Sequence, residues 1–152
     1  MEEALRLAEE AARQDEVPVG AVIVSAGRVV GRGMNQREQG RDATLHAEMC
    51  AIRQACATLG GWRIPNATLY VTLEPCPMCA GALVNARIQR LVYAASDPKA
   101  GAAGTVMNIV DHPHLNHRVL IQSGLLEEES IALLRTFFAG KRARQKQERE
   151  KG

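Results

Sequence analysis

Two short motifs contain residue types that can hold a metal ion and activate water. The first is His46-Ala47-Glu48, and the second is Pro75-Cys76-Pro77-Met78-Cys79. Imidazole and thiolate groups are the usual zinc donors in proteins. Three such donors, His46, Cys76 and Cys79, leave the fourth tetrahedral position free for water, as in catalytic zinc sites. We therefore expect one zinc ion per subunit and the chemistry of a metal-activated water.

The spacing within each motif places its polar groups at the start of a helix. Cys76 and Cys79 are three residues apart, so both thiolates lie on one face of a first helical turn. Pro77 suits the first helical position, which leaves Cys76 near the N-cap, where the helix dipole stabilises thiolates. Glu48 lies two residues after His46 and points to a different side of the helix start. It can approach a bound water without binding the metal, which predicts a catalytic proton shuttle.

The cysteines also leave a structural alternative open. A lone Cys-x-x-Cys occurs in structural zinc sites and in redox pairs as well. Cys50 follows His46 by four residues and could close a site with four protein ligands. A histidine turned toward the metal from the first helical turn would leave Cys50 one turn further away. We therefore interpret Cys50 and Cys56 as small core residues.

Periodicity and turn signals predict the elements that position these motifs. We expect helices over residues 2–16, 46–59, 77–88 and 127–146, strands over residues 19–24, 29–34, 68–73, 90–95 and 118–122, and a short helix over residues 105–110. Helices that alternate with strands predict a three-layer α/β/α sandwich around a central mixed five-stranded sheet. A chain of 152 residues suits a single domain over residues 1–152.

Composition narrows the class of protein. Hydrophobic residues make up 46% and charged residues 24%, as is usual for soluble globular proteins. No run of about 18 apolar residues predicts a membrane span. The acidic, amphipathic start is unlike a signal peptide, so we expect a cytoplasmic protein with reduced thiols. Residues 141–152 carry six basic and two acidic residues. Such a basic helix end can contact phosphates, although a frayed, solvated helix end is the simpler interpretation.

His-x-Glu followed by Pro-Cys-x-x-Cys is the signature of the zinc-dependent nucleobase deaminases. The chain as a whole closely resembles the bacterial tRNA-specific adenosine deaminases, within the cytidine/deoxycytidylate deaminase superfamily. The resembling segments are residues 16–22, 46–48, 69–76, 78–82, 87–88, 101–104 and 116–119, so they span nearly the whole chain.

The resemblance implies a cytidine deaminase-like fold, a homodimer, and hydrolytic conversion of adenosine to inosine at the wobble position of a tRNA anticodon, with an arginine tRNA expected. It implies that His46, Cys76 and Cys79 hold Zn2+ and that zinc-bound hydroxide attacks C6, with Glu48 as the proton shuttle. It also implies contacts with the substrate and the tRNA anticodon stem-loop from Asn35, Ala47, Asp97, Phe137, Phe138 and Arg142.

These implied contacts have simpler structural alternatives. Asn35 suits a turn, and Asp97 suits the turn before Pro98. The family usually has Asp-Pro-Thr-Ala before its His-Ala-Glu motif, where this chain has residues 42–45, Asp-Ala-Thr-Leu, which predicts a looser pocket edge.

Two other functions compete with tRNA deamination. One is deamination of free nucleosides or bases, such as guanine or deoxycytidylate, and the other is a non-catalytic, zinc-stabilised RNA-binding module. The basic tail and residues 97–104 favour a tRNA substrate, because an enzyme acting on free bases needs no surface that follows phosphates. Glu48 argues against the binding module, since a structural metal site needs no carboxylate beside an open ligand position.

Overall fold

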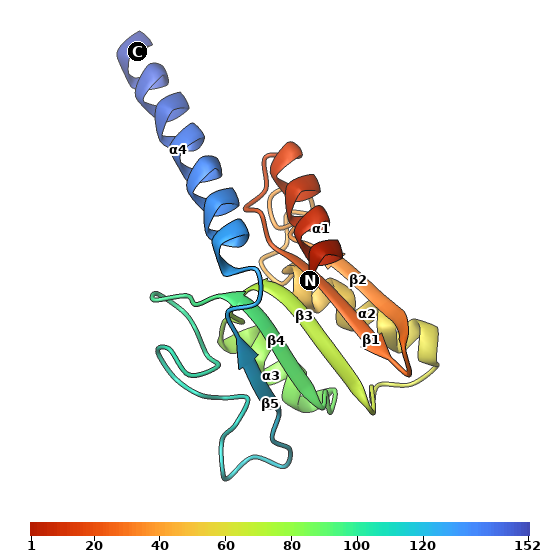
Figure 1. Cartoon of the computed structure of the whole chain (residues 1–152). Helices are drawn as coiled ribbons and strands as arrows, with labels where there is room; N and C mark the ends of the chain where they lie inside the picture. Colours follow the sequence, from red (N-terminus) through yellow and green to blue (C-terminus); the bar gives the residue numbers. More distant parts are fainter.

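A mixed five-stranded sheet forms the middle layer of the protein, whose computed structural model describes all 152 residues (Figure 1). The strands are β1 (Gly20–Ser25), β2 (Arg28–Met34), β3 (Ala67–Leu73), β4 (Arg90–Ala95) and β5 (Leu120–Ser123). They lie in the order β2-β1-β3-β4-β5, with β1 antiparallel to β2 and β3, and with β3, β4 and β5 parallel. The expected mixed five-stranded sheet is confirmed.

Four helices form the two outer layers. Helices α1 (Glu2–Arg13) and α4 (Glu127–Lys151) cover one face of the sheet, and α2 (Ala47–Leu59) and α3 (Pro77–Asn85) cover the other (Figure 1). The main apolar core joins the sheet to α2 and α3 and includes Ile23, Leu69, Leu83 and Leu91. The three-layer α/β/α architecture predicted from the sequence is therefore confirmed.

Small residues on both sides let α2 lie close to β2. A Cβ atom on Gly33 would lie 2.1 Å from the carbonyl oxygen of Ala47, and a Cβ atom on Gly31 would lie 2.3 Å from that of Ala51. The facing helix surface is built from buried alanines. Any side chain at either glycine would push α2 away from the sheet. This contact matters for the site, because the start of α2 carries the His-Ala-Glu motif.

Several predicted helix ends are corrected by the structure. Helix α1 ends at Arg13 rather than at residue 16, since Asp15 adopts a positive φ of 60°. Helix α3 ends at Asn85 rather than at residue 88, and Arg87, with a φ of 63°, turns the chain there. Left-handed backbone of this kind does not continue a helix.

The short helix expected over residues 105–110 is absent. This segment belongs to a long loop with an isolated bridge between Ala103 and Asn108, and the amides of Val106 and Met107 both donate to the carbonyl of Gly101. The last strand is also shorter than expected, because it begins at Leu120 rather than at residue 118. Non-helical hydrogen bonds within the loop, together with the Glu74 carboxylate that accepts the amide of Thr105, satisfy its backbone in place of a helix.

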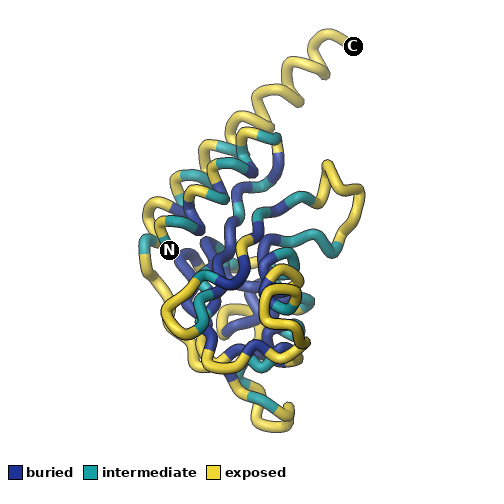
Figure 2. The backbone as a smooth tube through the Cα atoms, turned by 90° about the vertical axis from the view of Figure 1, so that its right-hand side faces the viewer, coloured by how far each residue is buried: buried dark blue, intermediate teal, exposed yellow.

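Helix α4 extends beyond the predicted residue 146 to Lys151. Its first turns are anchored to the sheet, since the Ser130 hydroxyl donates to the carbonyl oxygen of Thr72 at 2.5 Å. All residues from 138 onward are exposed, and the end of the helix projects away from the body (Figure 2). None of the four helices is both long and apolar enough to cross a lipid bilayer.

Candidate active site

Both sequence motifs lie at helix N-termini, as predicted. His46 is the N-cap residue of α2, and Cys76 is the N-cap residue of α3, each with extended backbone. Pro77 occupies the first helical turn of α3, where its missing N–H costs no intrahelical hydrogen bond. The two helix starts lie next to each other, so their dipoles stabilise negative charge between them.

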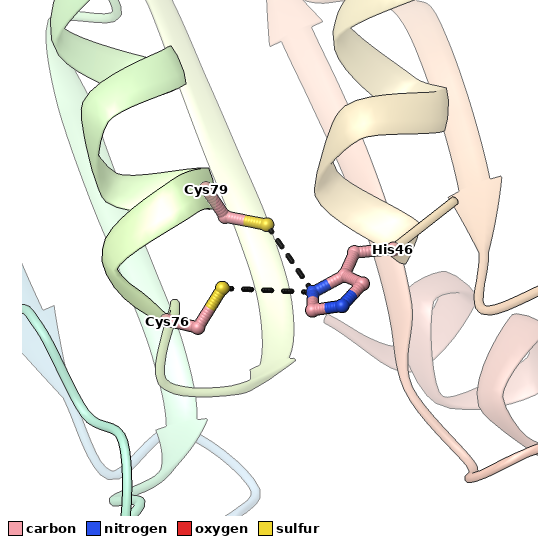
Figure 3. A group of neighbouring side chains, drawn as sticks. All are labelled: His46, Cys76 and Cys79. Atoms are coloured by element: carbon pink, nitrogen blue, oxygen red, sulfur yellow. Dashed lines mark hydrogen bonds between the residues drawn. The ribbon is translucent and has the colours of Figure 1, made fainter. Parts of the chain in front are cut away.

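Three metal donors converge at this point (Figure 3). The Sγ atoms of Cys76 and Cys79 each lie 3.6 Å from Nδ1 of His46, and the three donor atoms lie within 4.8 Å of one another. Cys50 is outside this group. It is half-buried beside Gly33 of β2, rather than in the core as expected, whereas Cys56 packs against the core. One histidine and two cysteines fit a zinc ion with one ligand position open.

Hydrogen bonds within this group shift the pKa values of the two cysteines in opposite directions. The pKa of Cys76 is lowered to about 4, mainly by a hydrogen bond from the Cys79 thiol and also by His46, while burial opposes the shift. The same contact with Cys76, together with burial, raises the pKa of Cys79. The pKa of His46 is raised, mainly by its hydrogen bond to Cys76. Negative charge therefore gathers on sulfur at the point where the donors meet, which favours a bound cation.

Glu48 is buried beside the three donors, with 4% of its surface exposed. The pKa of its carboxyl is raised to about 7, mainly by burial and also by the negative charge of Cys76. A hydrogen bond from the backbone amide of Glu48 opposes the shift, and so does the positive charge of His46. A carboxyl with such a pKa can accept and return a proton near neutral pH.

A pocket of about 230 Å³ opens in front of Glu48, and the predicted residues Asn35, Ala47 and Asp97 all line it. Asn35 also has the turn role considered above, since its Oδ1 accepts the amide of Arg37 at 3.1 Å. Asp97 likewise shapes a turn, because its Oδ1 accepts the amides of Lys99 and Ala100. For both residues, turn formation and a place in the pocket occur together.

Two of the other predicted substrate residues, Phe138 and Arg142 on α4, lie in a second, more open groove instead. Lys99 and Arg135 line the same groove, which is therefore basic. Phe137 lines neither the pocket nor the groove. Its half-buried ring contacts the ring of Phe138 edge to face, with the two ring centroids 5.3 Å apart. Since Asp97 faces the pocket and Lys99 faces the groove, one short loop separates the two hollows.

Comparison with known proteins agrees with this geometry. The family described as MafB19-like deaminase matches residues 1–139. The tRNA-specific adenosine deaminase of Bacillus subtilis is 47% identical over 150 residues, which cover 99% of this chain and 93% of that protein. The chain belongs to the tRNA-specific adenosine deaminase family.

Solved structures of two kinds of deaminase share the fold of this protein. A structure from a study of A-to-I editing by tRNA:A34 deaminases at the wobble position is 49% identical, with a TM-score of 0.85, and the match covers 88% of this chain and 97% of that one. A guanine deaminase from Nitrosomonas europaea is 26% identical, with a TM-score of 0.79, and the match covers 91% and 82%. The similarity is thus greater, in sequence and in fold, to the tRNA:A34 deaminase.

The edge of the pocket formed by residues 35–45 is held by several hydrogen bonds. Asp42 accepts the amide and the hydroxyl of Thr44 at 2.8 and 2.7 Å. The carbonyl of Leu45 accepts the amide of Gln36 at 3.0 Å, and the Leu45 side chain lies against Gly40. In this deaminase, both the backbone and the side chain of Leu45 therefore contact other residues of the same loop.

Sequence reasoning missed two buried carboxylates that hold the loops beside the pocket. Glu16 accepts the amide of Glu38 at 2.7 Å, and Glu74 accepts amides from residues 97–105. Both are almost fully buried. The available signal was an acidic residue at the edge of an apolar run, in Glu16-Val17-Pro18-Val19 and at the end of β3. Such acids are rarely buried unless they are paired or hydrogen-bonded.

Proposed function

We propose that this protein is a zinc-dependent deaminase that converts adenosine to inosine at the wobble position of a tRNA anticodon. The observation that carries the proposal is similarity to tRNA-specific adenosine deaminases along the whole chain, centred on a pocket that contains His46, Cys76, Cys79 and Glu48. An arginine tRNA is the expected substrate, and the cytoplasm, which keeps thiols reduced, is the expected compartment.

His46, Cys76 and Cys79 would hold one zinc ion per subunit. The donor set supports this assignment, because one imidazole and two thiolates are typical zinc ligands and leave a position open. Zinc bound there would lower the pKa of a water molecule toward 7 and so provide the nucleophile for hydrolysis.

Glu48 would move the protons of the reaction. Its carboxylate takes a proton from the attacking water and carries it to a ring nitrogen of adenine, which makes C6 more electrophilic. After the water oxygen has bonded to C6, Glu48 takes the remaining proton from the new C6 hydroxyl and delivers it to the amino group, so that the C6–N bond breaks, ammonia leaves and the C6 carbonyl of inosine remains. A pKa near 7 suits both proton uptake and proton release, and burial keeps bulk water from competing.

The surroundings of Glu48 would bind the nucleoside and its RNA. Asn35, Ala47 and Asp97 would contact the target nucleoside or its neighbour inside the pocket. Phe138 and Arg142, on the groove beside it, would contact the anticodon stem-loop, and Phe137 supports the Phe138 ring. Aromatic rings stack on unpaired bases, and arginine binds phosphate. The resemblance also predicts a homodimer.

Deamination of a free base is the competing function, since the fold also resembles that of a guanine deaminase. One assay separates these activities. The purified protein is incubated with a tRNA that has adenosine at the wobble position, and separately with free adenosine, cytidine and guanine. Inosine formed in the tRNA alone supports the proposal. Turnover of free adenosine, cytidine or guanine without tRNA editing would assign the protein to deamination of free nucleosides or bases, and no turnover would favour a binding module.

A further inference from the structure

We propose that Glu74 is a positioning residue of the deaminase, which holds residues 97–105 in place as one wall of the substrate pocket. The inference rests on the proposed function and assigns a role to a residue outside the zinc and proton-shuttle machinery. Glu74 follows β3 and lies two residues before Cys76. It lines the pocket, yet only 2% of its surface is exposed.

Four donors from one loop meet at the two oxygens of this carboxylate. Oε1 accepts the backbone amide of Asp97 at 3.1 Å and the hydroxyl of Thr105. Oε2 accepts the backbone amides of Ala103 and Thr105 at 3.0 and 3.2 Å. A carboxylate only accepts hydrogen bonds, so it matches four donors, one of which, the amide of the buried Ala103, would otherwise have no partner. Glu74 therefore joins the two ends of the loop at a single point.

The loop also fits closely around the carboxylate. A Cβ atom on Gly101 would lie 2.5 Å from Cδ and from both carboxylate oxygens of Glu74. The next residue, Ala102, donates its amide to the carbonyl of Pro75 at 2.8 Å. With both oxygens occupied, Glu74 acts on the substrate only through the loop residues Asp97 and Ala100, which face the pocket. This arrangement separates substrate positioning from proton transfer by Glu48.

Replacement of Glu74 by glutamine tests this role, because an amide keeps the size but accepts on one oxygen only. If that oxygen keeps the amides of Ala103 and Thr105, the NH₂ group faces the amide of Asp97, which loses its acceptor. We expect KM for an anticodon stem-loop RNA to rise by about tenfold, as the loss of a hydrogen bond to a charged group predicts. We expect kcat and metal content to stay close to wild type, since Glu48 and the metal donors are unchanged.

Gly101→Ala provides a second variant that retains Glu74 but displaces its carboxylate. Gly101 does not have a positive φ, so alanine adds a steric contact without backbone strain. Asp111→Asn is the matched control, because it makes the same chemical change in the same long segment, at a half-buried residue that pairs with Arg118 outside the pocket. We expect Gly101→Ala to raise KM and the control to leave KM unchanged. The double variant Glu74→Gln/Gly101→Ala should have a KM no higher than that of the more severe single variant, because both changes disturb the same contact.

The measurements are kcat and KM on the stem-loop, metal content, and thermal melting of each variant. A wild-type KM in Glu74→Gln, or a fall in kcat or metal content with KM unchanged, overturns the inference. If Glu74→Gln does not fold, Gly101→Ala decides by the same criteria. Failure of the wild-type protein to deaminate the stem-loop would instead overturn the proposed function, so the two failures are distinguishable.

Discussion

Glu48 and Glu74 are both almost fully buried and line the same pocket, but their surroundings differ. Glu74 accepts four hydrogen bonds from the backbone and hydroxyl of one loop. Glu48 lies beside two thiols and a histidine, and burial raises its pKa to about 7. Burial alone therefore does not identify the proton shuttle that we propose for Glu48. A carboxylate surrounded by donors holds structure, whereas one with few donors can exchange a proton.

The position of each glutamate in the fold explains this difference. Glu48 lies in the first turn of α2, where it faces the start of α3 and the metal donors. Glu74 lies where β3 ends, beside a loop with no regular structure, whose amides need acceptors. Each of the following experiments tests one side of this comparison.

The largest effect is expected from loss of a metal donor, since the role of Glu48 depends on the site beside it. Cys76→Ala and Cys79→Ala should each lose the bound zinc and all measurable deamination. Cys50→Ala should keep both, because Cys50 lies outside the donor group. Metal analysis of the purified variants and a tRNA deamination assay check these expectations. An empty site in Cys50→Ala would mean that four protein ligands bind the metal, and the catalytic interpretation would fail.

Glu48→Gln should have the next largest effect. The variant keeps the size of the side chain but removes the proton acceptor. General acid–base groups contribute about 10²–10⁴-fold, and in the proposed mechanism this group serves several proton transfers, so we expect a loss at or beyond the upper end. Single-turnover rates on tRNA measure the loss, with zinc content as the control, which should not change. Near-normal turnover would show that Glu48 does not transfer protons in the reaction. The proposed functional difference between Glu48 and Glu74 would then be wrong.

Asp97→Asn should have a smaller and more selective effect. The Asn Oδ1 can still accept the amides of Lys99 and Ala100, so the turn is retained while the charge is lost. A carboxylate accepts a hydrogen bond from a 2′-hydroxyl, the group that distinguishes RNA from DNA, and is unfavourable without that partner. We expect deamination of a single-stranded DNA copy of the anticodon loop to rise relative to RNA. An unchanged ratio of the two rates would leave Asp97 with its turn role alone.

The smallest effect is expected from the exposed end of α4. Removal of residues 141–152 removes a net charge of +4. If this end contacts phosphates, tRNA affinity should fall and its dependence on salt should become shallower, by about 0.7 in log–log slope for each contact with a single strand. Arg142→Ala and Arg149→Ala form a matched pair, because only Arg142 lines the basic groove. The measurement is a binding titration at several salt concentrations. If the truncated protein and both arginine variants bind tRNA as the wild type does, residues 141–152 do not contact the RNA.

The sequence predicted that His46, Cys76 and Cys79 cluster, because much of the chemistry of this group is local. Cys76, Pro77 and Cys79 lie within one helical turn, and helix-start preferences determine their arrangement. The position of His46 beside them, 30 residues away in sequence, followed only from the expected chemistry. The second groove was not predicted, because α4 meets the loop after β4 only in the folded chain.

By itself, the sequence determined the number and type of the main elements, the two motifs that meet in the site and the class of reaction, because hydrophobic period, helix caps and donor types act over a few residues. Tertiary structure alone decided the strand order, the loop in place of a helix at residues 105–110, and the roles of Glu16 and Glu74. The physical reason is that a buried carboxylate is stable only where distant backbone amides converge on it. Those amides come together only when the sheet has brought its loops to one edge.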